Sequence, residues 1–203
     1  MSTSSDESAD LRESILDAAN ELLLDAGYTG ITMRKVADRI GYSATTIYLH
    51  FANKDALLHA LIERGYRLLH SAMHRVADEG ADPIARIEAL CRCYVRFGLD
   101  HPAYYEVMFM LHPRFMERYP ADKYREARRN MDAFAQTLVE AQRAGKAQVS
   151  DLRAGANALW AMLHGVVSLL IARRMDVRVD RDALIDTSIR GVVRSIAPTA
   201  VLA

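Results

Sequence analysis

Hydroxyl, basic and aromatic side chains that can donate hydrogen bonds to phosphate are concentrated between Thr32 and Lys54. The segment reads TMRKVADRIGYSATTIYLHFANK, and its spacing predicts two short helices joined by a tight turn, followed by the start of a third. In a helix-turn-helix, the second helix enters the major groove while hydroxyls and backbone amides bind phosphate oxygens. The chemistry that these residue types indicate is therefore non-covalent binding to a DNA duplex.

The second helix of this pair is expected over residues 43–51, with Ile47 and Phe51 packed inward. Its outward side chains fall into two groups. Short side chains let the helix approach base edges, and a threonine methyl can contact a thymine methyl; this group comprises Ala44, Thr45 and Thr46. Tyr48 and His50 are better placed for phosphate oxygens, where they would set orientation rather than sequence preference.

Cations occupy two helix starts, where the helix dipole makes them unfavourable by about 0.3–1 kcal/mol. Arg34 and Lys35 follow the expected cap Thr32, and Lys54 follows the expected cap Asn53. A phosphate at each helix start would explain both placements. The alternative is a solvated charge at the end of a surface helix, which is common for any single case. Two cases that flank one helix-turn-helix favour the phosphate interpretation.

The stretch ILDAANELLLDAGYTGITMRKVADRIGYSATTIYLHFANKDALL resembles the N-terminal DNA-binding domain of the TetR family of transcriptional regulators. Within it, the pattern TxxxVAxxxGxSxxTIYxHFxxKxxLL is highly specific, and the resemblance covers about residues 11–58. It implies that the bases face Ala44, Thr45 and Thr46. It also implies that the DNA backbone is contacted by Thr32, Ser43, Tyr48, His50 and Lys54. The chain departs from the usual family pattern at Thr45 and at Gly41-Tyr42.

Apolar residues recur at helical spacing along nearly the whole chain, and no credible strand pattern occurs. Caps and breakers divide the pattern into roughly nine helices, so the expected fold is all-α. Residues 9–55 are expected to form a three-helix DNA-binding domain, and residues 56–198 a larger effector-binding and dimerisation domain. Residues 1–8 and 199–203 are expected to fray. Expected helix ends include Gly27, Gly41 and Gly145, and expected helix starts include Asp151 and Asp180.

The C-terminal half resembles the WHG-type effector domain of one branch of the family, through Trp160-x-x-x-His164-Gly165 and HPAYYEVMF from residue 101. Trp160 and His164 share a helix face. They either form the walls of a pocket that binds an inducer, or they belong to the core, where the histidine stacks on the tryptophan. A second cluster either lines an apolar cavity or is ordinary core, the commoner case; it comprises Tyr104, Tyr105, Met108 and Phe109, with Met110. The expected effector is a small, apolar molecule.

The last two helices, about residues 151–173 and 180–196, are implied by the resemblance to form a four-helix dimer interface. Gly165 in mid-helix costs roughly 1 kcal/mol relative to alanine, which predicts a close helix approach or a pocket floor. Small side chains continue this face at Ala161, Ser168 and Ala172. These residues suit a tight bundle between two subunits.

Several other classes of function find no support in the sequence. It contains no Gly-x-Ser-x-Gly, no phosphate loop and no His-Glu-x-x-His, so an enzyme and a cofactor are not expected. Cys91 and Cys93 point about 200° apart on a helix, which suits two reduced thiols rather than a disulfide or a metal site. No apolar run approaches the roughly 18–20 residues that span a bilayer, and the polar, acidic N-terminus is no signal peptide. A cytoplasmic protein without membrane contact is expected.

The net charge of the N-terminal segment is unfavourable for binding to DNA. The chain has 26 Lys/Arg and 26 Asp/Glu, and residues 1–55 hold five basic and nine acidic residues, a net charge of −4. A DNA-binding domain is usually basic. Because Asp17, Glu21 and Asp25 lie on the first helix, outside the segment 32–54, the position of a few cations must replace the missing bulk charge.

The expected function is that of a homodimeric, ligand-responsive regulator, a repressor that is released from DNA by a small molecule. Dimer symmetry predicts a pseudo-palindromic operator, with recognition helices about 34–36 Å apart or a multiple of that. One alternative is a DNA-bound scaffold of the same fold that binds a protein partner instead. Another is an all-α ligand carrier or enzyme with no role on DNA.

Overall fold

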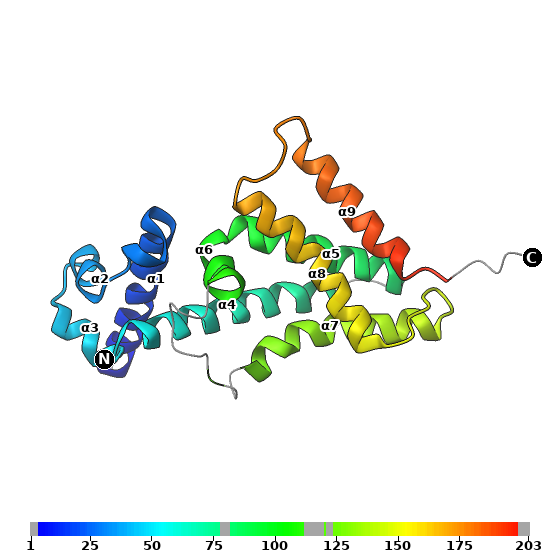
Figure 1. The fold of residues 1–203 in the computed structure, drawn as a ribbon. Helices are drawn as coiled ribbons and strands as arrows, with labels where there is room; N and C mark the ends of the chain where they lie inside the picture. Colours follow the sequence, from blue (N-terminus) through cyan, green and yellow to red (C-terminus); the bar gives the residue numbers. More distant parts are fainter. Residues whose placement is uncertain (1–3, 78–81, 112–119, 121–123, 199–203) are drawn as a thin grey trace, which may run out of the picture. The chain divides into compact units, whose positions relative to one another are not determined.

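The computed structural model describes residues 4–77, 82–111, 120 and 124–198, and all regular structure within these ranges is helical (Figure 1). Nine α-helices and one short π-helical segment, η1, follow one another along these ranges, and no strand occurs in them. The prediction of an all-α fold with roughly nine helices is therefore confirmed.

The chain divides into two compact units. The first comprises residues 1–65 and 101–120. It contains α1 (Ser4–Gly30), α2 (Met33–Ile40), α3 (Ala44–His50), the first half of α4 (Lys54–Ala77), α6 (Pro102–Tyr105) and η1 (Glu106–Met110). The second comprises the remaining residues. It contains the rest of α4, α5 (Pro83–Asp100), α7 (Tyr124–Arg143), α8 (Leu152–Ile171) and α9 (Arg181–Ser195).

This division falls after Gly65, whereas the sequence analysis placed a boundary after residue 55. Gly65 supplies the physical reason, because a Cβ atom built at this position would lie 2.4 Å from Met108 Sδ. The missing side chain lets η1 approach α4 closely, which attaches the segment 101–111 to the unit that contains the helix-turn-helix.

Helix α1 begins and ends differently from expectation. It starts at Ser4, so residues 4–8 are helical rather than frayed, while residues 1–3 and 199–203 lie outside the described ranges. Gly27 does interrupt the helix, with φ +63° and ψ −172°, but one further turn continues to Gly30. The apolar face of α1 is fully buried at Ile15, Leu16 and Ala19, which form the core of the first unit with residues of α2, α3 and α4.

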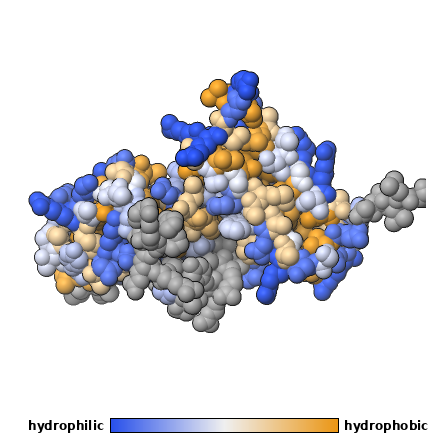
Figure 2. All heavy atoms as spheres, viewed as in Figure 1, coloured by the Kyte–Doolittle hydropathy of each residue, from blue (hydrophilic) through white to orange (hydrophobic). Residues whose placement is uncertain are grey.

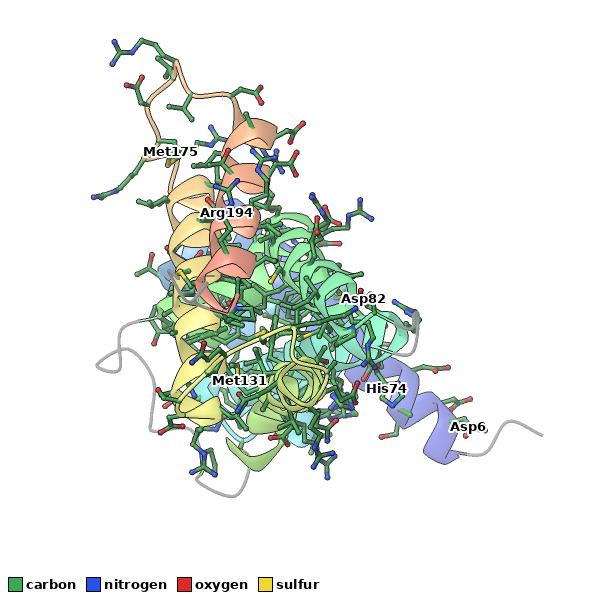
Figure 3. All side chains as sticks on the ribbon, turned by 90° about the vertical axis from the view of Figure 1, so that its right-hand side faces the viewer. Asp6, His74, Asp82, Met131, Met175 and Arg194 are labelled. Atoms are coloured by element: carbon green, nitrogen blue, oxygen red, sulfur yellow. The ribbon has the colours of Figure 1, made fainter. Side chains whose placement is uncertain are left out.

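The second unit is built around α5, which packs against α7, α8 and α9. Its core contains Tyr94, Phe134, Leu163 and Ile189, one from each of these helices. Aspartate caps begin three of these helices, including the two starts predicted at Asp151 and Asp180. The side chain of Asp82 accepts from the Ile84 N–H at 2.8 Å before α5 (Figure 3). Asp151 and Asp180 accept from amides in the first turns of α8 and α9. Cys91 and Cys93 are free thiols, as expected.

Helix α8 carries apolar residues on a face that the described part of the chain leaves exposed. Met162 is 42% exposed and Leu169 is 44% exposed, and apolar side chains lie on the visible surface of this unit (Figure 2). A Cβ atom at Gly165 would meet nothing within 4 Å among the described residues, so none of these residues makes the close helix approach that was one of the two predictions for this glycine. By length and mean hydropathy, α8 is the one helix in the described ranges that could span a bilayer, against the expectation that no segment would qualify. A single such helix is weak evidence for a membrane protein.

Candidate nucleic-acid interface

The helix-turn-helix is positioned by side-chain caps at both of its helices. Thr32 Oγ1 accepts from the Lys35 N–H at 3.2 Å and so begins α2. Gly41 ends α2 in the left-handed region, with φ +74° and ψ +27°, and its N–H bonds to the Ala37 carbonyl. Ser43 Oγ then accepts from the Thr46 N–H at 3.1 Å and begins α3. These hydroxyls satisfy amides that a helix start leaves without partners, which confirms the predicted ends.

The two hydroxyl groups at the start of α3 also bind each other. Ser43 Oγ and Thr46 Oγ1 lie 2.9 Å apart, and either one can be the donor. One hydroxyl hydrogen is used in this bond, so the pair keeps the other for a partner outside the chain. A phosphate oxygen is a suitable acceptor for it.

Helix α3 presents a different outward face from the one predicted. Ile47 and Phe51 are buried, as expected, and Thr45 and Tyr48 are exposed. Three other predicted residues are only half-exposed, namely Ala44, Thr46 and His50. Leu49, which was not among the predicted outward residues, is 81% exposed, more than Tyr48 at 52%. Helix periodicity could have predicted this exposure, because Leu49 lies about 200° around the helix from the inward-facing Ile47.

Lys54 has partners within the chain, which changes the interpretation of its position. Its Nζ donates to the Tyr28 carbonyl oxygen at 2.7 Å and lies 3.6 Å from the centroid of the Tyr28 ring. Burial lowers the pKa of Lys54, although the neighbouring Asp55 opposes this shift. The lysine thus joins the start of α4 to the last turn of α1. The contact with Tyr28 explains the position of Lys54 without a phosphate, and contact of Lys54 with the DNA backbone stays a prediction.

Arg34 and Lys35 keep their predicted position on the surface. Both are exposed, and neither side chain forms an ion pair within the part of the chain that the structure describes. Arg39 differs, since it bonds to Glu21 at 3.1 Å and to Asp25 at 3.0 Å. The hydrogen bond that Arg39 donates to Asp25 is the main reason why the pKa of Arg39 is raised. Arg34 and Lys35 are thus the cations of α2 that remain available to an anion.

Arg64 neutralises further acidic groups of α1. It lies 2.7 Å from Asp17 and 3.6 Å from Glu13. Together, Arg39 and Arg64 pair with four of the nine acidic residues that gave the N-terminal segment its net charge of −4. The acidic composition is therefore partly compensated on α1, and its repulsion of DNA is weaker than the charge count implies.

The structure places the six predicted effector residues in different units. Tyr104 and Tyr105 are buried and Met108 and Phe109 are half-buried, all within the first unit. The rings of Tyr105 and Phe109 meet edge to face at 4.9 Å. This is the geometry of ordinary core packing, and the role of these residues in effector binding stays a prediction.

Trp160 and His164 belong to the second unit and do share a helix face. Their rings stack at 5.2 Å with an angle of 24° between the planes. The Trp160 indole N–H donates to the Tyr94 hydroxyl at 2.9 Å, and burial lowers the pKa of His164. The geometry is that of a histidine packed on a tryptophan, and contact with an inducer stays a prediction.

Two hollows in the second unit are lined by other residues. One of about 280 Å³ lies between α5 and α9, beside Arg96, Asp100 and Arg181. The other, of about 360 Å³, lies among α4, α5 and α7, beside His70 and Arg129. Both have charged linings, in contrast to the expected apolar pocket. Among the described residues, no group of three His, Cys, Asp or Glu side chains could hold a metal ion.

Comparison with known protein families identifies both parts of the chain. The family described as "Bacterial regulatory proteins, tetR family" matches residues 15–61. The family described as "Tetracyclin repressor-like, C-terminal domain" matches residues 87–192, which is more than half of the chain. The chain belongs to the TetR family. This membership confirms the resemblance found in the sequence. The branch indicated by Trp160, His164 and Gly165 is not named by the match and stays a prediction.

Curated relatives of this TetR-family protein match over limited lengths. The class D tetracycline repressor protein of Escherichia coli is 52% identical over 50 residues, which cover 25% of this chain and 23% of that protein. The nucleoid occlusion factor SlmA of Vibrio vulnificus is 33% identical over 98 residues, covering 48% of this chain and 50% of that protein. The chain thus spans half or less of the length of the curated relatives that it matches.

Solved structures match this TetR-family protein over nearly its whole length. A protein of unknown function from Rhodococcus sp. RHA1 is 28% identical with a TM-score of 0.79, covering 93% of this chain and 95% of that chain. The fatty acid degradation regulator FadR from Bacillus halodurans is 21% identical with a TM-score of 0.74, covering 90% of this chain and 94% of that chain. The likeness to FadR shows a common fold.

Proposed function

We propose that this TetR-family transcriptional regulator acts in the cytoplasm as a repressor, binds a pseudo-palindromic operator as a homodimer and leaves it when a small molecule binds. The observation that carries the DNA-binding part is the capped helix-turn-helix, because its second helix turns Thr45, Tyr48 and Leu49 outward while Ile47 is buried. A rigid, outward-facing helix of this kind is what major-groove entry requires.

The proposed contacts follow from this geometry. Arg34, with the hydroxyls of Thr32 and Ser43, would bind phosphate oxygens on either side of the turn, and Tyr48 and His50 would add contacts from α3. Ala44, Thr45 and Thr46 would face the bases. Lys54 can join the phosphate contacts without leaving Tyr28, because an ammonium group has three donors and the Tyr28 carbonyl uses one.

Homodimerisation through α8 and α9 is supported by the apolar surface that the protomer leaves open. Met162 and Leu169 are exposed on α8, and no described residue lies within 4 Å of a Cβ atom built at Gly165. A second copy of the same face would bury these residues and use that space for close helix packing. Sedimentation should show a dimer that Leu169→Glu dissociates, since a carboxylate buried in an apolar interface is strongly unfavourable.

Release by a small molecule is supported by the match to the tetracyclin repressor-like C-terminal domain. The ligand would need a higher affinity for the conformation that does not fit the operator. A ligand that binds tightly without changing operator affinity would remove this part of the proposal.

A second candidate is a DNA-bound scaffold that binds a protein partner. It is favoured by the match to the nucleoid occlusion factor SlmA, which extends over 98 residues and thus well beyond the helix-turn-helix. The two candidate functions differ in their effect on transcription. A repressor lowers transcription from a promoter that contains the operator in a purified system, whereas a scaffold leaves transcription unchanged there.

The deciding experiment is selection of genomic DNA fragments by the purified protein, followed by footprinting. We expect enrichment of fragments that share one pseudo-palindrome, with protection on one face of the duplex. Recovery of fragments without any shared motif, and with uniform affinity, would contradict the proposal.

A further inference from the structure

Leu49 is an unusual side chain for the surface of a seven-residue helix. It is 81% exposed, more than Tyr48 at 52% or Tyr42 at 51% in the same helix-turn-helix. An isolated exposed leucine needs no explanation on a protein surface. Here, however, the leucine lies on the helix that the proposed function places in the major groove, on the side opposite the buried Ile47. Its exposure therefore coincides with the surface that would meet base edges.

The chemistry of α3 limits which bases it can distinguish. Residues 44–50 read ATTIYLH and contain no arginine, lysine, asparagine or glutamine, the side chains that bind guanine or adenine through paired hydrogen bonds. The Thr46 hydroxyl is held against Ser43 Oγ at 2.9 Å, which restricts its use toward a base. Tyr48 and His50 are assigned above to phosphate oxygens. The outward groups that remain are the methyl groups of Leu49 and Ala44 and the methyl and hydroxyl groups of Thr45. In the major groove, the matching apolar group is the C5 methyl of thymine.

Leu49 and Thr45 place methyl groups on the same face of α3. They are four residues apart, so they are neighbours on the same helix face, and both are exposed. Four residues correspond to about 6 Å along the helix axis, which is roughly two base-pair steps of 3.4 Å each. Both methyl-bearing side chains can therefore meet thymines that lie close together in one half-site.

We propose that Leu49, with Thr45, determines operator specificity by contacting thymine C5 methyl groups in each half-site. This inference rests on the proposed function and deepens it, since it names the chemical group that the recognition helix reads. The contact involves no hydrogen bond to the base, so the specificity of α3 is set by apolar contact. Leu49 is thus a specificity-determining residue absent from the positions predicted by sequence.

The test uses the operator recovered by fragment selection and a series of duplexes in which one thymine at a time is replaced by deoxyuridine. This replacement removes only the C5 methyl. Burial of one methyl corresponds to about a fourfold change in affinity, and to about fifteenfold when both half-sites are changed. We expect the full-length wild-type protein to show this loss at one or two thymines of each half-site, measured by fluorescence anisotropy at fixed salt.

The matched variants are Leu49→Ala and Leu24→Ala. Leu24 is a leucine of α1 that is 55% exposed and lies outside the helix-turn-helix. We expect Leu49→Ala to weaken operator binding and to abolish the difference between thymine and deoxyuridine at the sensitive positions. We expect Leu24→Ala to leave both unchanged. Because both side chains are exposed, both variants should keep the wild-type circular dichroism and unfolding midpoint.

Each remaining outcome would overturn the inference. Specific binding with no deoxyuridine-sensitive position would refute methyl reading and leave the proposed function intact. An undiminished deoxyuridine effect in Leu49→Ala would assign the contact to another residue. A change in oligomeric state of Leu49→Ala, without a change in base preference, would identify the leucine as a protein contact. Failure of the wild-type protein to enrich any DNA fragment would overturn the proposed function, and this inference with it.

Discussion

Replacing Lys54 by methionine separates the contact of its ammonium group with Tyr28 from the phosphate contact proposed for the same group. The change keeps the length of the side chain but removes its charge and its three donors. In the folded protein it deletes the hydrogen bond to the Tyr28 carbonyl at 2.7 Å and the contact with the Tyr28 ring at 3.6 Å. Methionine also retains a weak contact between its sulfur and the ring, so little packing should be lost.

The expected loss of stability follows from these two contacts. A hydrogen bond to a charged group contributes about 1.5–3 kcal/mol, and an exposed cation–π contact about 0.5–1 kcal/mol. The net loss of stability is smaller than this sum, because the charged lysine is partly desolvated in the folded state, as its lowered pKa indicates, and the substitution removes that cost. We therefore expect the free energy of unfolding to fall by about 1–2 kcal/mol. Urea titration followed by circular dichroism measures it.

The same variant tests the phosphate contact through the salt dependence of operator binding. If Lys54 also binds a phosphate, the slope of log affinity against log salt should decrease by about one for each bound protomer. Arg34→Met is the matched control, since Arg34 has no ion pair in the described structure; it should reduce the slope without lowering stability. An unchanged unfolding midpoint for Lys54→Met would refute the reasoning from the Tyr28 contacts. An unchanged salt slope would restrict Lys54 to a structural role.

Three further predictions concern individual side chains and backbone positions. Gly41→Ala should lower the free energy of unfolding by about 1–2 kcal/mol, since φ is +74° there although space is open around a Cβ atom. Gly41→Asn, which tolerates this conformation better, should cost less in the same urea titration. For His164, burial favours the neutral imidazole, so the free energy of unfolding should fall as pH decreases through about 6.5. His164→Gln should reduce that fall between pH 7.5 and 5.5, and an identical pH dependence would contradict the assignment. Burial raises the pKa of Cys91 to about 12, so iodoacetamide at pH 8 should label it far more slowly than the less buried Cys93. Mass spectrometry of the native protein distinguishes the two, and equal rates would contradict the burial.

Local chemistry made the helix ends predictable. The sequence predicts caps at Thr32 and Asn53 and a helix start at Ser43, and each of these side chains accepts a hydrogen bond from an amide three residues later. Caps depend on residues that are adjacent in the chain, so a single sequence contains the necessary information. The resemblance of residues 11–58 to one family supplied the rest of the N-terminal fold.

Contacts between distant residues could not be predicted in the same way. Lys54 and Tyr28 are 26 residues apart, and Arg39 and Asp25 are 14 residues apart. Their partners depend on how the helices pack, which helix periodicity does not determine. The surroundings of Gly165 could not be predicted for a related reason. An apolar helix face indicates burial, but it does not indicate whether the same chain or a second copy covers that face.

Trp160 is the one tryptophan of the chain, and it lies in the second unit against Tyr94 and His164. Intrinsic indole emission therefore reports the environment of that unit alone, whereas circular dichroism reports helices of both. Coincident unfolding curves from the two signals would show that the units melt as one cooperative system. Separate curves would show that the helix-turn-helix unit can lose its structure while the other remains folded. The placement of a single chromophore thus makes the cooperativity between the two units measurable without any label.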